Sequence, residues 1–298
     1  MKKFFGLLFI GAALLMMFGC SDTPPTQSSS PPGVDHSVAL VERPEFIETR
    51  PQEIVSTFTL NQSMIPLSVL EKKPPKPPPD DTTSGDPNPN PAHKYAYIVG
   101  ISNYEGTAND LNYCDDDAQA MKSWLQGEGF TCRMDLDLQA TADNIIAGLQ
   151  WLIDNASPGD EICFSYSGHG MRSSEGSAII SADLYYIPHG FAMSYFNAAN
   201  CTKKLVCIDA CVIGGFHEDV ISGTFMATAS NRRNSYDAPD LNQGAWTYYW
   251  LYGAENVGLI YAEEAAPYAE DGMKDWAALY RLKVDPKHSD AYTGEMDM

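Results

Sequence analysis

Apolar residues between positions 94 and 298 occur in short continuous runs separated by longer stretches with helical spacing. The runs predict buried strands over 95–100, 130–134, 161–166, 205–209 and 223–229. In the intervening stretches, apolar side chains recur every three or four residues, which predicts helices. Because strand and helix alternate, the pattern predicts an α/β fold with a mostly parallel central sheet and helices on both faces.

Two helices are predicted before the strand at 161–166. Asn109 or Asp110 is expected to cap the first, and Thr141 is expected to cap the second. Their apolar faces consist of Leu111, Ala118, Met121 and Leu125 in the first helix, and Ile145, Leu149 and Leu152 in the second.

The N-terminus has the pattern of a secretory signal. Lys2 and Lys3 precede an apolar run over 4–18 that is short for a membrane span. The run ends in Gly19-Cys20, which resembles a bacterial lipobox, so residues 1–19 are expected to be a lipoprotein signal peptide and Cys20 the lipidated residue. Acyl chains on Cys20 would anchor the protein in the bacterial cell envelope. An ordinary cleaved signal with a chance cysteine remains the alternative. Ser21 after the cysteine favours the outer membrane, or the periplasmic face, where the cell has two membranes.

Residues 20–93 have the composition of a tether. Two proline-rich blocks, PPTQSSSPP and KKPPKPPPDDTTSGDPNPNP, are unsuited to a packed core and favour extended conformations. Between them, residues 52–70 are apolar and β-branched enough to predict one or two strands. This segment either docks on the edge of the following domain or acts as a pro-segment over the active site, and the sequence does not separate the two.

The overall charge limits the class of partner. The 298 residues carry a formal net charge of −20, which argues against nucleic acid because phosphate binding needs a basic face. The acidity is equally compatible with basic substrates and with simple solubility.

Two of the predicted strands end at residues that could carry chemistry. The run 161–166 is followed by the motif Ser-Gly-His-Gly, which contains His169, and the run 205–209 is followed by Cys211 two residues later. In a parallel α/β sheet, catalytic groups collect at the carboxyl ends of neighbouring strands. A cysteine and a histidine at that edge form a nucleophile and a general base.

The order and context of these motifs resemble the caspase and metacaspase peptidases. The segments YAYIVGISNYEG and LNYCDDDAQAM before them, and ATASNRRNSYDAPDLNQGAWTYYWLYG after them, are similar to further parts of that family, so the resemblance spans residues 94–298. Caspases carry Gln-Ala-Cys at the nucleophile, whereas Asp209-Ala210-Cys211 resembles metacaspases and their bacterial relatives. The resemblance implies a caspase-like three-layer sandwich over 94–298, with His169 and Cys211 as the catalytic pair and the N–H groups of Gly170 and Cys211 as oxyanion donors.

The same resemblance implies a substrate pocket. By position, its residues are Cys114, Asp117, Ser167 and Asp209. Two carboxylates in one partly buried pocket repel each other and are relieved by a cation, so Arg or Lys is expected before the scissile bond. The alternative for the acidic run 115–117 is a solvated helix start, which accounts less well for Asp209 at the end of an apolar strand. Arg172 would suit an acidic substrate, but Asp209 argues against that specificity.

No cofactor is expected to be required. Cys201, Cys207, Cys211 and His169 lack the close ligand spacing of a zinc site. Residues 171–190 are short and poor in acids, which argues against a calcium site there, although Glu218 and Asp219 leave a hard cation open.

Two classes of function follow. The first is a lipid-anchored cysteine endopeptidase that cleaves peptides or proteins after Arg or Lys. The second is a catalytically inactive caspase-like module that binds or scaffolds partners in the cell envelope. The presence of both His169 and Cys211 favours the first.

Overall fold

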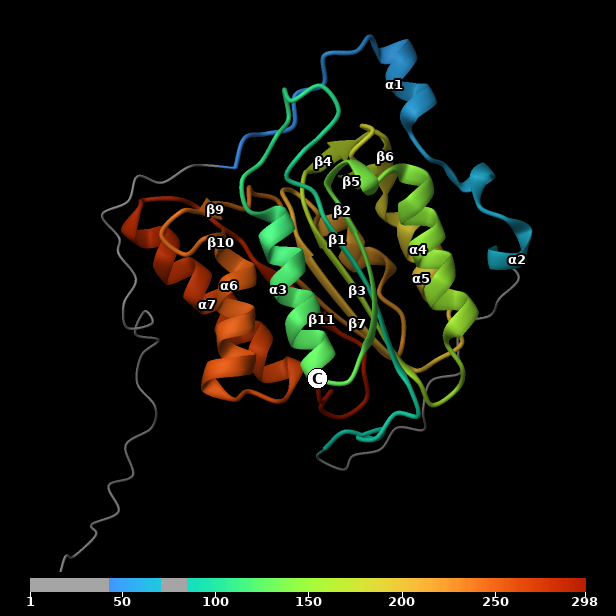
Figure 1. The fold of residues 1–298 in the computed structure, drawn as a ribbon, viewed down its shortest axis with the longest axis vertical. Helices are drawn as coiled ribbons and strands as arrows, with labels where there is room; N and C mark the ends of the chain where they lie inside the picture. Colours follow the sequence, from blue (N-terminus) through green and yellow to red (C-terminus); the bar gives the residue numbers. More distant parts are fainter. Residues whose placement is uncertain (1–42, 71–84) are drawn as a thin grey trace, which may run out of the picture.

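A six-stranded sheet forms the centre of the protein in this computed structural model, which describes residues 43–70 and 85–298 (Figure 1). The strand order is β11-β8-β7-β3-β1-β2. Five strands are parallel and β11 is antiparallel to β8. The bounds are β1 Lys94–Gly100, β2 Thr131–Leu136, β3 Glu161–Ser167, β7 Lys203–Asp209, β8 Thr224–Thr228 and β11 Lys287–Asp290. The five predicted strands are therefore confirmed, with small shifts at their ends.

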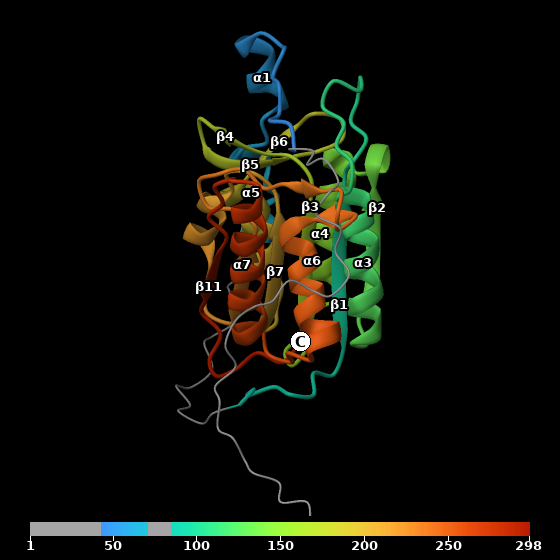
Figure 2. The same cartoon turned by 90° about the vertical axis from the view of Figure 1, so that its left-hand side faces the viewer.

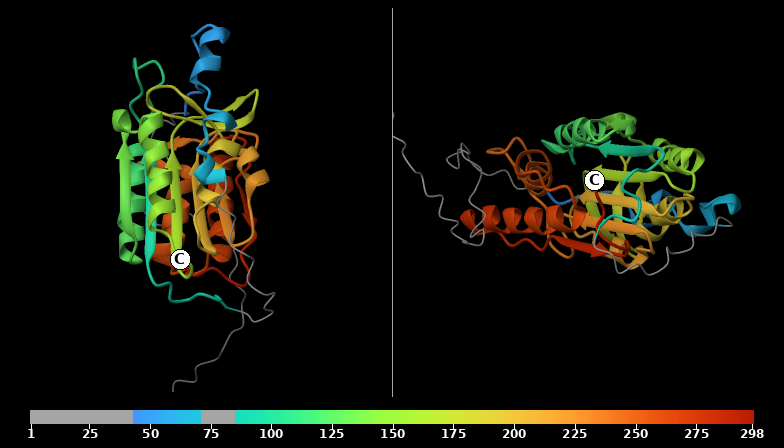
Figure 3. Two further views of the ribbon diagram at one scale, coloured as in Figure 1. Left: turned by 90° about the vertical axis from the view of Figure 1, so that its right-hand side faces the viewer. Right: turned by 90° about the horizontal axis from the view of Figure 1, so that it is seen from below.

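Helices cover both faces of this sheet. One face carries α3 (Cys114–Gly127), α6 (Ala245–Tyr252) and α7 (Ala262–Leu279), and the other carries α4 (Ala142–Asn155) and α5 (His189–Asn197). Each interface is filled by its own apolar cluster, and successive residues of the central strands alternate between the two. The layers are visible from below in Figure 3. The expected three-layer sandwich is confirmed.

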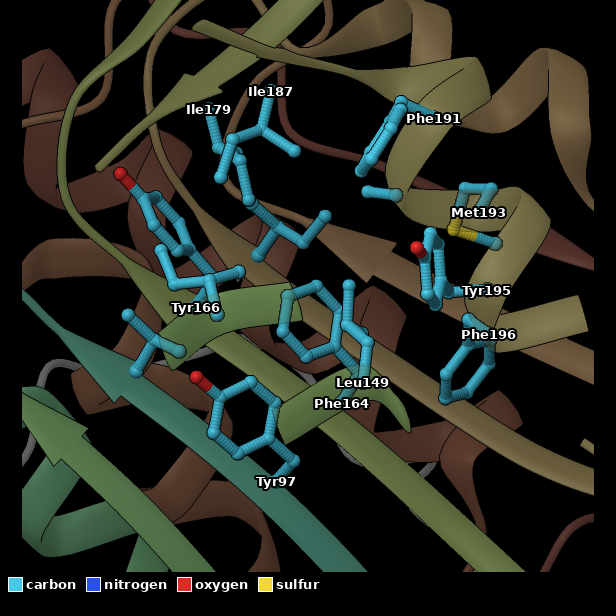
Figure 4. Close-up of a cluster of buried hydrophobic side chains, with 14 of the residues drawn as sticks. Tyr97, Leu149, Phe164, Tyr166, Ile179, Ile187, Phe191, Met193, Tyr195 and Phe196 are labelled. Atoms are coloured by element: carbon cyan, nitrogen blue, oxygen red, sulfur yellow. The ribbon is translucent and has the colours of Figure 1, made fainter. Parts of the chain in front are cut away.

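The cluster beneath α4 and α5 shows why the central strands are apolar throughout. All seven residues of both β3 and β7 are buried, because helices pack on each side of them. Figure 4 shows Phe164 of β3 near Leu149 of α4, Phe196 of α5 and Tyr97 of β1. The strands at the centre of the sheet are thus held rigidly on both faces, and the residues that directly follow their carboxyl ends have well-defined positions.

The predicted helix caps differ in outcome. The Thr141 hydroxyl accepts a hydrogen bond from the Asn144 N–H at 3.3 Å, as expected for an N-cap. The expected cap of the first helix is wrong, because α3 begins at Cys114 and Leu111 precedes it. Asn109 and Asp110 instead accept hydrogen bonds from the backbone of other segments, so their side chains close a loop rather than a helix end.

A second, antiparallel sheet lies beyond the carboxyl ends of the central strands. It consists of β4 (Gly170–Ser173), β5 (Gly176–Ile180) and β6 (Tyr186–Pro188), and Figure 2 shows it above the main sheet. These strands are too short for the sequence pattern to predict. The remaining short elements are η2 Asp137–Gln139, η3 Gly214–Asp219, β9 Asp237–Ala238, β10 Gln243–Gly244 and the π-helical η4 Gly253–Val257.

Residues 43–70 pack against this end of the protein. The prediction of strands over 52–70 is wrong, since α1 (Gln52–Phe58), η1 (Gln62–Met64) and α2 (Leu67–Leu70) form there. Only Thr59 makes a β-bridge, to Tyr186 of β6. Four apolar side chains of the segment are buried in the cluster under α4 and α5, namely Val55, Leu60, Ile65 and Val69. Four others are exposed, namely Ile54, Met64, Leu67 and Leu70. The segment is therefore docked on the domain.

The structure does not test the predicted signal peptide and lipidation site. The signal peptide and Cys20 lie outside the described residues. No helix in the described ranges has both the length and the apolar character needed to cross a membrane.

A close approach between α4 and β1 gives a test of this packing. A Cβ atom on Gly148 would lie 2.0 Å from the Tyr97 ring, whereas one on Gly127 at the end of α3 would meet nothing within 4 Å. We expect Gly148→Ala to lower the free energy of unfolding by about 1–3 kcal/mol through overpacking. We expect the control Gly127→Ala to raise it by up to about 1 kcal/mol, because alanine is the better helix former. Chemical denaturation measures both, and equal effects would contradict the packing described.

Candidate active site

The two catalytic candidates lie at the same edge of the sheet. β3 and β7 are parallel neighbours with Ser167 opposite Asp209, so His169 and Cys211 each follow their strand by two residues. Their side chains are almost fully enclosed, with 1% and 3% of their surface exposed. The geometry predicted from the strand ends is therefore present, in a closed environment.

The His169 ring is held through one of its nitrogens. Its Nε2 lies 2.8 Å from the Asn109 carbonyl oxygen, which only accepts, so Nε2 carries the proton. Nδ1 is buried and has no hydrogen-bond partner among the described residues. Burial lowers the pKa of His169 to about 4, against the opposing effect of the Asn109 bond. The ring is therefore neutral, with Nδ1 free to act as a base.

Cys211 is also uncharged in this environment. Burial raises the pKa of the Cys211 thiol to about 11, although the Arg43 charge and the Ser235 backbone act in the opposite direction. The Ser235 N–H donates to the Cys211 sulfur at 3.3 Å. Cys211 is thus a neutral thiol and His169 a neutral imidazole, at the ends of neighbouring strands.

The backbone after the nucleophile is strained. Val212 has a φ of 49°, a left-handed value that is rare for a β-branched residue. Its N–H donates to the Arg233 carbonyl at 2.9 Å, and its carbonyl accepts from the Ser177 hydroxyl at 2.8 Å. Strain of this kind persists only where the surroundings enforce it, and it clusters at functional sites. The turn therefore holds Cys211 in a defined orientation.

Gly170 lies directly against this turn. A Cβ atom on Gly170 would come within 2.2 Å of the Cys211 carbonyl oxygen. The two backbones that the family resemblance names as oxyanion donors are thus in close contact, and a side chain at position 170 would separate them.

The structure brings the four predicted pocket residues together. The Ser167 hydroxyl donates to Asp117 at 2.7 Å, and both carboxylates, Asp117 and Asp209, are buried beside Cys114 at the start of α3. Burial and the neighbouring Asp209 raise the pKa of Asp117, while Arg43 opposes the shift. The pocket is therefore a place where a cation is needed.

That cation is Arg43, from the segment before α1. Its Nε donates to Asp237 at 2.9 Å, and its Nη1 donates to the Asp209 carbonyl oxygen at 2.8 Å and to the Asp209 carboxylate at 3.2 Å. Nη2 lies 3.9 Å from Asp117. The guanidinium is fully buried. The pocket thus binds an arginine side chain in this structure.

Sequence reasoning missed three kinds of residue here. Asp237 on β9 is a third pocket carboxylate, and it lies in the stretch that resembles the family's substrate loop, which was the available signal. Thr247 and Ser235 donate to Asp209 through their hydroxyls and orient it. Nothing local marked Arg43, which reaches Asp237 across 194 positions of sequence.

The remaining residues considered for substrate or cation binding lie outside the carboxylate pocket. Arg172 lines a separate cavity of about 500 Å³ with Ser177 and Val212, outside the carboxylate pocket. In the part of the chain that the structure describes, no group of three or more His, Cys, Asp or Glu side chains is placed to hold a metal ion. Asp219, one of the two acids left open for a hard cation, lies 2.5 Å from His189 Nδ1.

Comparisons with known proteins place the chain in a family. Metacaspase-2 of Trypanosoma brucei brucei is 34% identical over 111 residues, which are 33% of this chain and 32% of that protein. Metacaspase-1 of Debaryomyces hansenii is 39% identical over 87 residues, 26% of this chain and 20% of that protein. The matched region thus spans about a third or less of these relatives.

A crystal structure of a Geobacter sulfurreducens protein has a TM-score of 0.52 at 17% identity, covering 69% of this chain and 97% of that one, which shows a shared fold. The family model described as "Caspase domain" matches residues 93–272. Because this match covers more than half of the sequence, the chain belongs to the caspase-domain family.

Proposed function

We propose that the protein is a lipid-anchored cysteine endopeptidase that cleaves peptide bonds after Arg or Lys through Cys211 and His169. The observation that carries the proposal is the Arg43 guanidinium, bound by buried carboxylates in the pocket beside these two residues. A pocket that holds one arginine side chain has the chemistry to hold that of a substrate. Family membership and the metacaspase relatives support a peptidase of this type.

The arrangement gives each residue a role in acyl transfer. His169 Nδ1 takes the thiol proton of Cys211 as the sulfur attacks the carbonyl carbon of the scissile bond. The N–H groups of Gly170 and Cys211 stabilise the oxyanion. His169 then returns the proton to the departing amine, leaving a thioester that water hydrolyses.

Specificity follows from the geometry of the carboxylates. Asp209 and Asp237 accept from different nitrogens of one guanidinium, and Asp117 closes the third side. A planar guanidinium satisfies several acceptors at once, whereas an ammonium is a single point charge. Arg is therefore expected to be preferred to Lys.

The closed state of the site is also compatible with the second class of function, a catalytically inactive binding or scaffold module. With Cys211 only 3% exposed, the described conformation resembles a binding module more than an open enzyme. An arginine-based chloromethyl ketone distinguishes the two, since only a competent nucleophile is alkylated.

We propose that neither calcium nor another cofactor is required.

The first prediction concerns catalysis. Cys211→Ala and His169→Ala should each lower kcat/KM for an Arg peptide by at least about 10³-fold, because they remove the nucleophile or its base. Hydrolysis is measured in the native chain and in an Arg43→Ala background, whose pocket is free of the chain's own arginine. The matched controls are Cys132→Ala, on β2, and His93→Ala, at an exposed position. Unchanged turnover in either test variant would refute the dyad.

The second prediction concerns specificity. In the Arg43→Ala background, Asp209→Asn or Asp237→Asn should lower kcat/KM for Arg peptides by about 30-fold or more, since loss of a buried charge partner costs about 2–5 kcal/mol. This background is needed because in the native chain the same change also removes a partner of Arg43. Turnover of a matched citrulline peptide, which is neutral and of similar shape, should change much less. Asp154→Asn on the solvent side of α4 is the control. A wild-type preference for Asp over Arg would contradict the pocket.

The third prediction concerns the anchor. Gly19-Cys20 after an apolar run predicts a mature N-terminus at a lipid-modified Cys20 in the cell envelope. Mass spectrometry of the mature protein from a bacterial host should find the acylated cysteine, and Cys20→Ser should release the protein from membranes. An unmodified Cys20 in the mature chain would exclude this route of attachment.

A further inference from the structure

We propose that residues 43–70 are a tethered inhibitor of the active site, in which Arg43 occupies the substrate pocket and Pro44 prevents cleavage of the chain after that arginine. The inference rests on the proposed function and specifies how the same site is regulated. It combines three observations: an occupied pocket, a covered histidine, and a proline directly after the bound arginine.

The first observation is that Arg43 makes the contacts expected of a substrate side chain. It bonds to Asp209 and Asp237 and is fully buried. Gly244 closes the floor of the pocket, where a Cβ atom would lie 2.6 Å from carboxylate oxygens of Asp117 and Asp209 and 3.2 Å from Arg43. No room remains there for a second guanidinium, so a substrate arginine must first displace Arg43.

The second observation is that the next residues cover His169. The Phe46 ring packs edge-on against His169 at 5.6 Å between centroids and against Tyr186 at 5.7 Å. The Ile47 N–H donates at 2.9 Å to the side chain of Asn109, whose carbonyl holds His169. Since Arg43 lies in the pocket and Phe46 on the histidine, the chain between them crosses the site. Figure 1 shows this path above the carboxyl ends of the strands.

The segment is anchored at several points besides Arg43. Arg50 pairs with Glu48 at 2.6 Å and donates to the Leu184 carbonyl at 2.8 Å, and Glu48 accepts from the Tyr186 hydroxyl. Further on, the Leu60 N–H donates to the Tyr186 carbonyl at 2.9 Å. These contacts keep Arg43 next to its pocket at an effective concentration on the order of millimolar, well above that of most peptide substrates.

The third observation explains how the inhibitor survives in its own active site. Cleavage after Arg43 would require Cys211 to attack the Arg43 carbonyl carbon and the nitrogen of residue 44 to leave with a proton from His169. At Pro44 that nitrogen bears no hydrogen, and a ring carbon stands in its place and crowds the approach of the acid. The ring also fixes φ and restricts the preceding residue. Arg43 is therefore bound in the manner of a substrate and is not consumed, so the site opens by displacement of the segment.

Arg43→Ala in the full chain tests the occupancy. It should raise both the initial rate of Arg-peptide hydrolysis and the rate of Cys211 alkylation by an arginine-based chloromethyl ketone, each by at least about tenfold, because the tethered competitor is gone. Arg133→Ala on β2, which removes a positive charge away from the site, should leave both rates unchanged. Equal, measurable rates in wild type and Arg43→Ala would overturn the inhibitor and leave the proposed function intact.

Pro44→Ala tests the role of the proline. With an ordinary amide at that position, the chain should be cut after Arg43, and intact-mass analysis should find the new N-terminus at residue 44. Wild type and the double variant Pro44→Ala/Cys211→Ala should not be cut there. Cutting of the wild type after Arg43 would overturn the proposed role of Pro44. The same conclusion would follow if the Pro44→Ala chain stayed uncut while the Arg43→Ala variant showed peptidase activity.

Failure of the proposed function gives a different result. If Arg43→Ala neither hydrolyses Arg peptides nor reacts with the chloromethyl ketone while circular dichroism shows it folded, the cysteine peptidase proposal is refuted. Activity in that variant combined with an equally active wild type refutes the inhibitor alone.

Discussion

The burial of three carboxylates at one edge of the sheet is the constraint on which the site depends. Asp117, Asp209 and Asp237 are each about 1% exposed or less, and ionised carboxylates are removed from water at high cost unless a cation and hydrogen bonds compensate them. Arg43 supplies the charge, and groups such as Thr247 and Gly244 supply the remaining hydrogen bonds. The pocket is thus stable when a guanidinium fills it. The guanidinium of Arg43 meets this need in the structure, and an arginine side chain of a substrate is proposed to meet it in the same way.

The same enclosure affects the ionisation of His169 and Cys211. Both side chains are nearly excluded from solvent, and burial shifts both pKa values toward the neutral forms, to about 4 for His169 and about 11 for Cys211. A thiol in that state reacts slowly, since the thiolate is the nucleophile. Occupancy of the pocket by Arg43 and the neutral state of the Cys211 thiol therefore occur together in the docked conformation. The proposed inhibition by the segment rests on both.

The positions of the pocket groups depend in turn on the central sheet. β3 and β7 are fully buried neighbours, so their carboxyl ends are fixed relative to each other by packing on both faces. The left-handed turn at Val212 and the close contact at Gly170 then orient the nucleophile. A rigid scaffold with functional groups on the loops at its edge is the usual arrangement in α/β proteins.

The sequence by itself determined the five parallel strands of the central sheet, the helices α3 and α4, and the placement of His169 and Cys211 at the ends of β3 and β7. The strands and helices arise from local periodicity, which acts over a few residues. The placement of His169 and Cys211 follows from the general rule that parallel strands bring their carboxyl ends to one edge of the sheet. Tertiary structure alone decided the helical form of residues 52–70, because Val55, Leu60, Ile65 and Val69 pack on the cluster under α4 and α5. It also decided the start of α3 at Cys114, since the side chain of Asn109 is used by Ile47. Above all, it decided that Arg43 meets Asp237, because an ion pair across 194 positions leaves no local pattern and forms only when the whole fold brings its partners together.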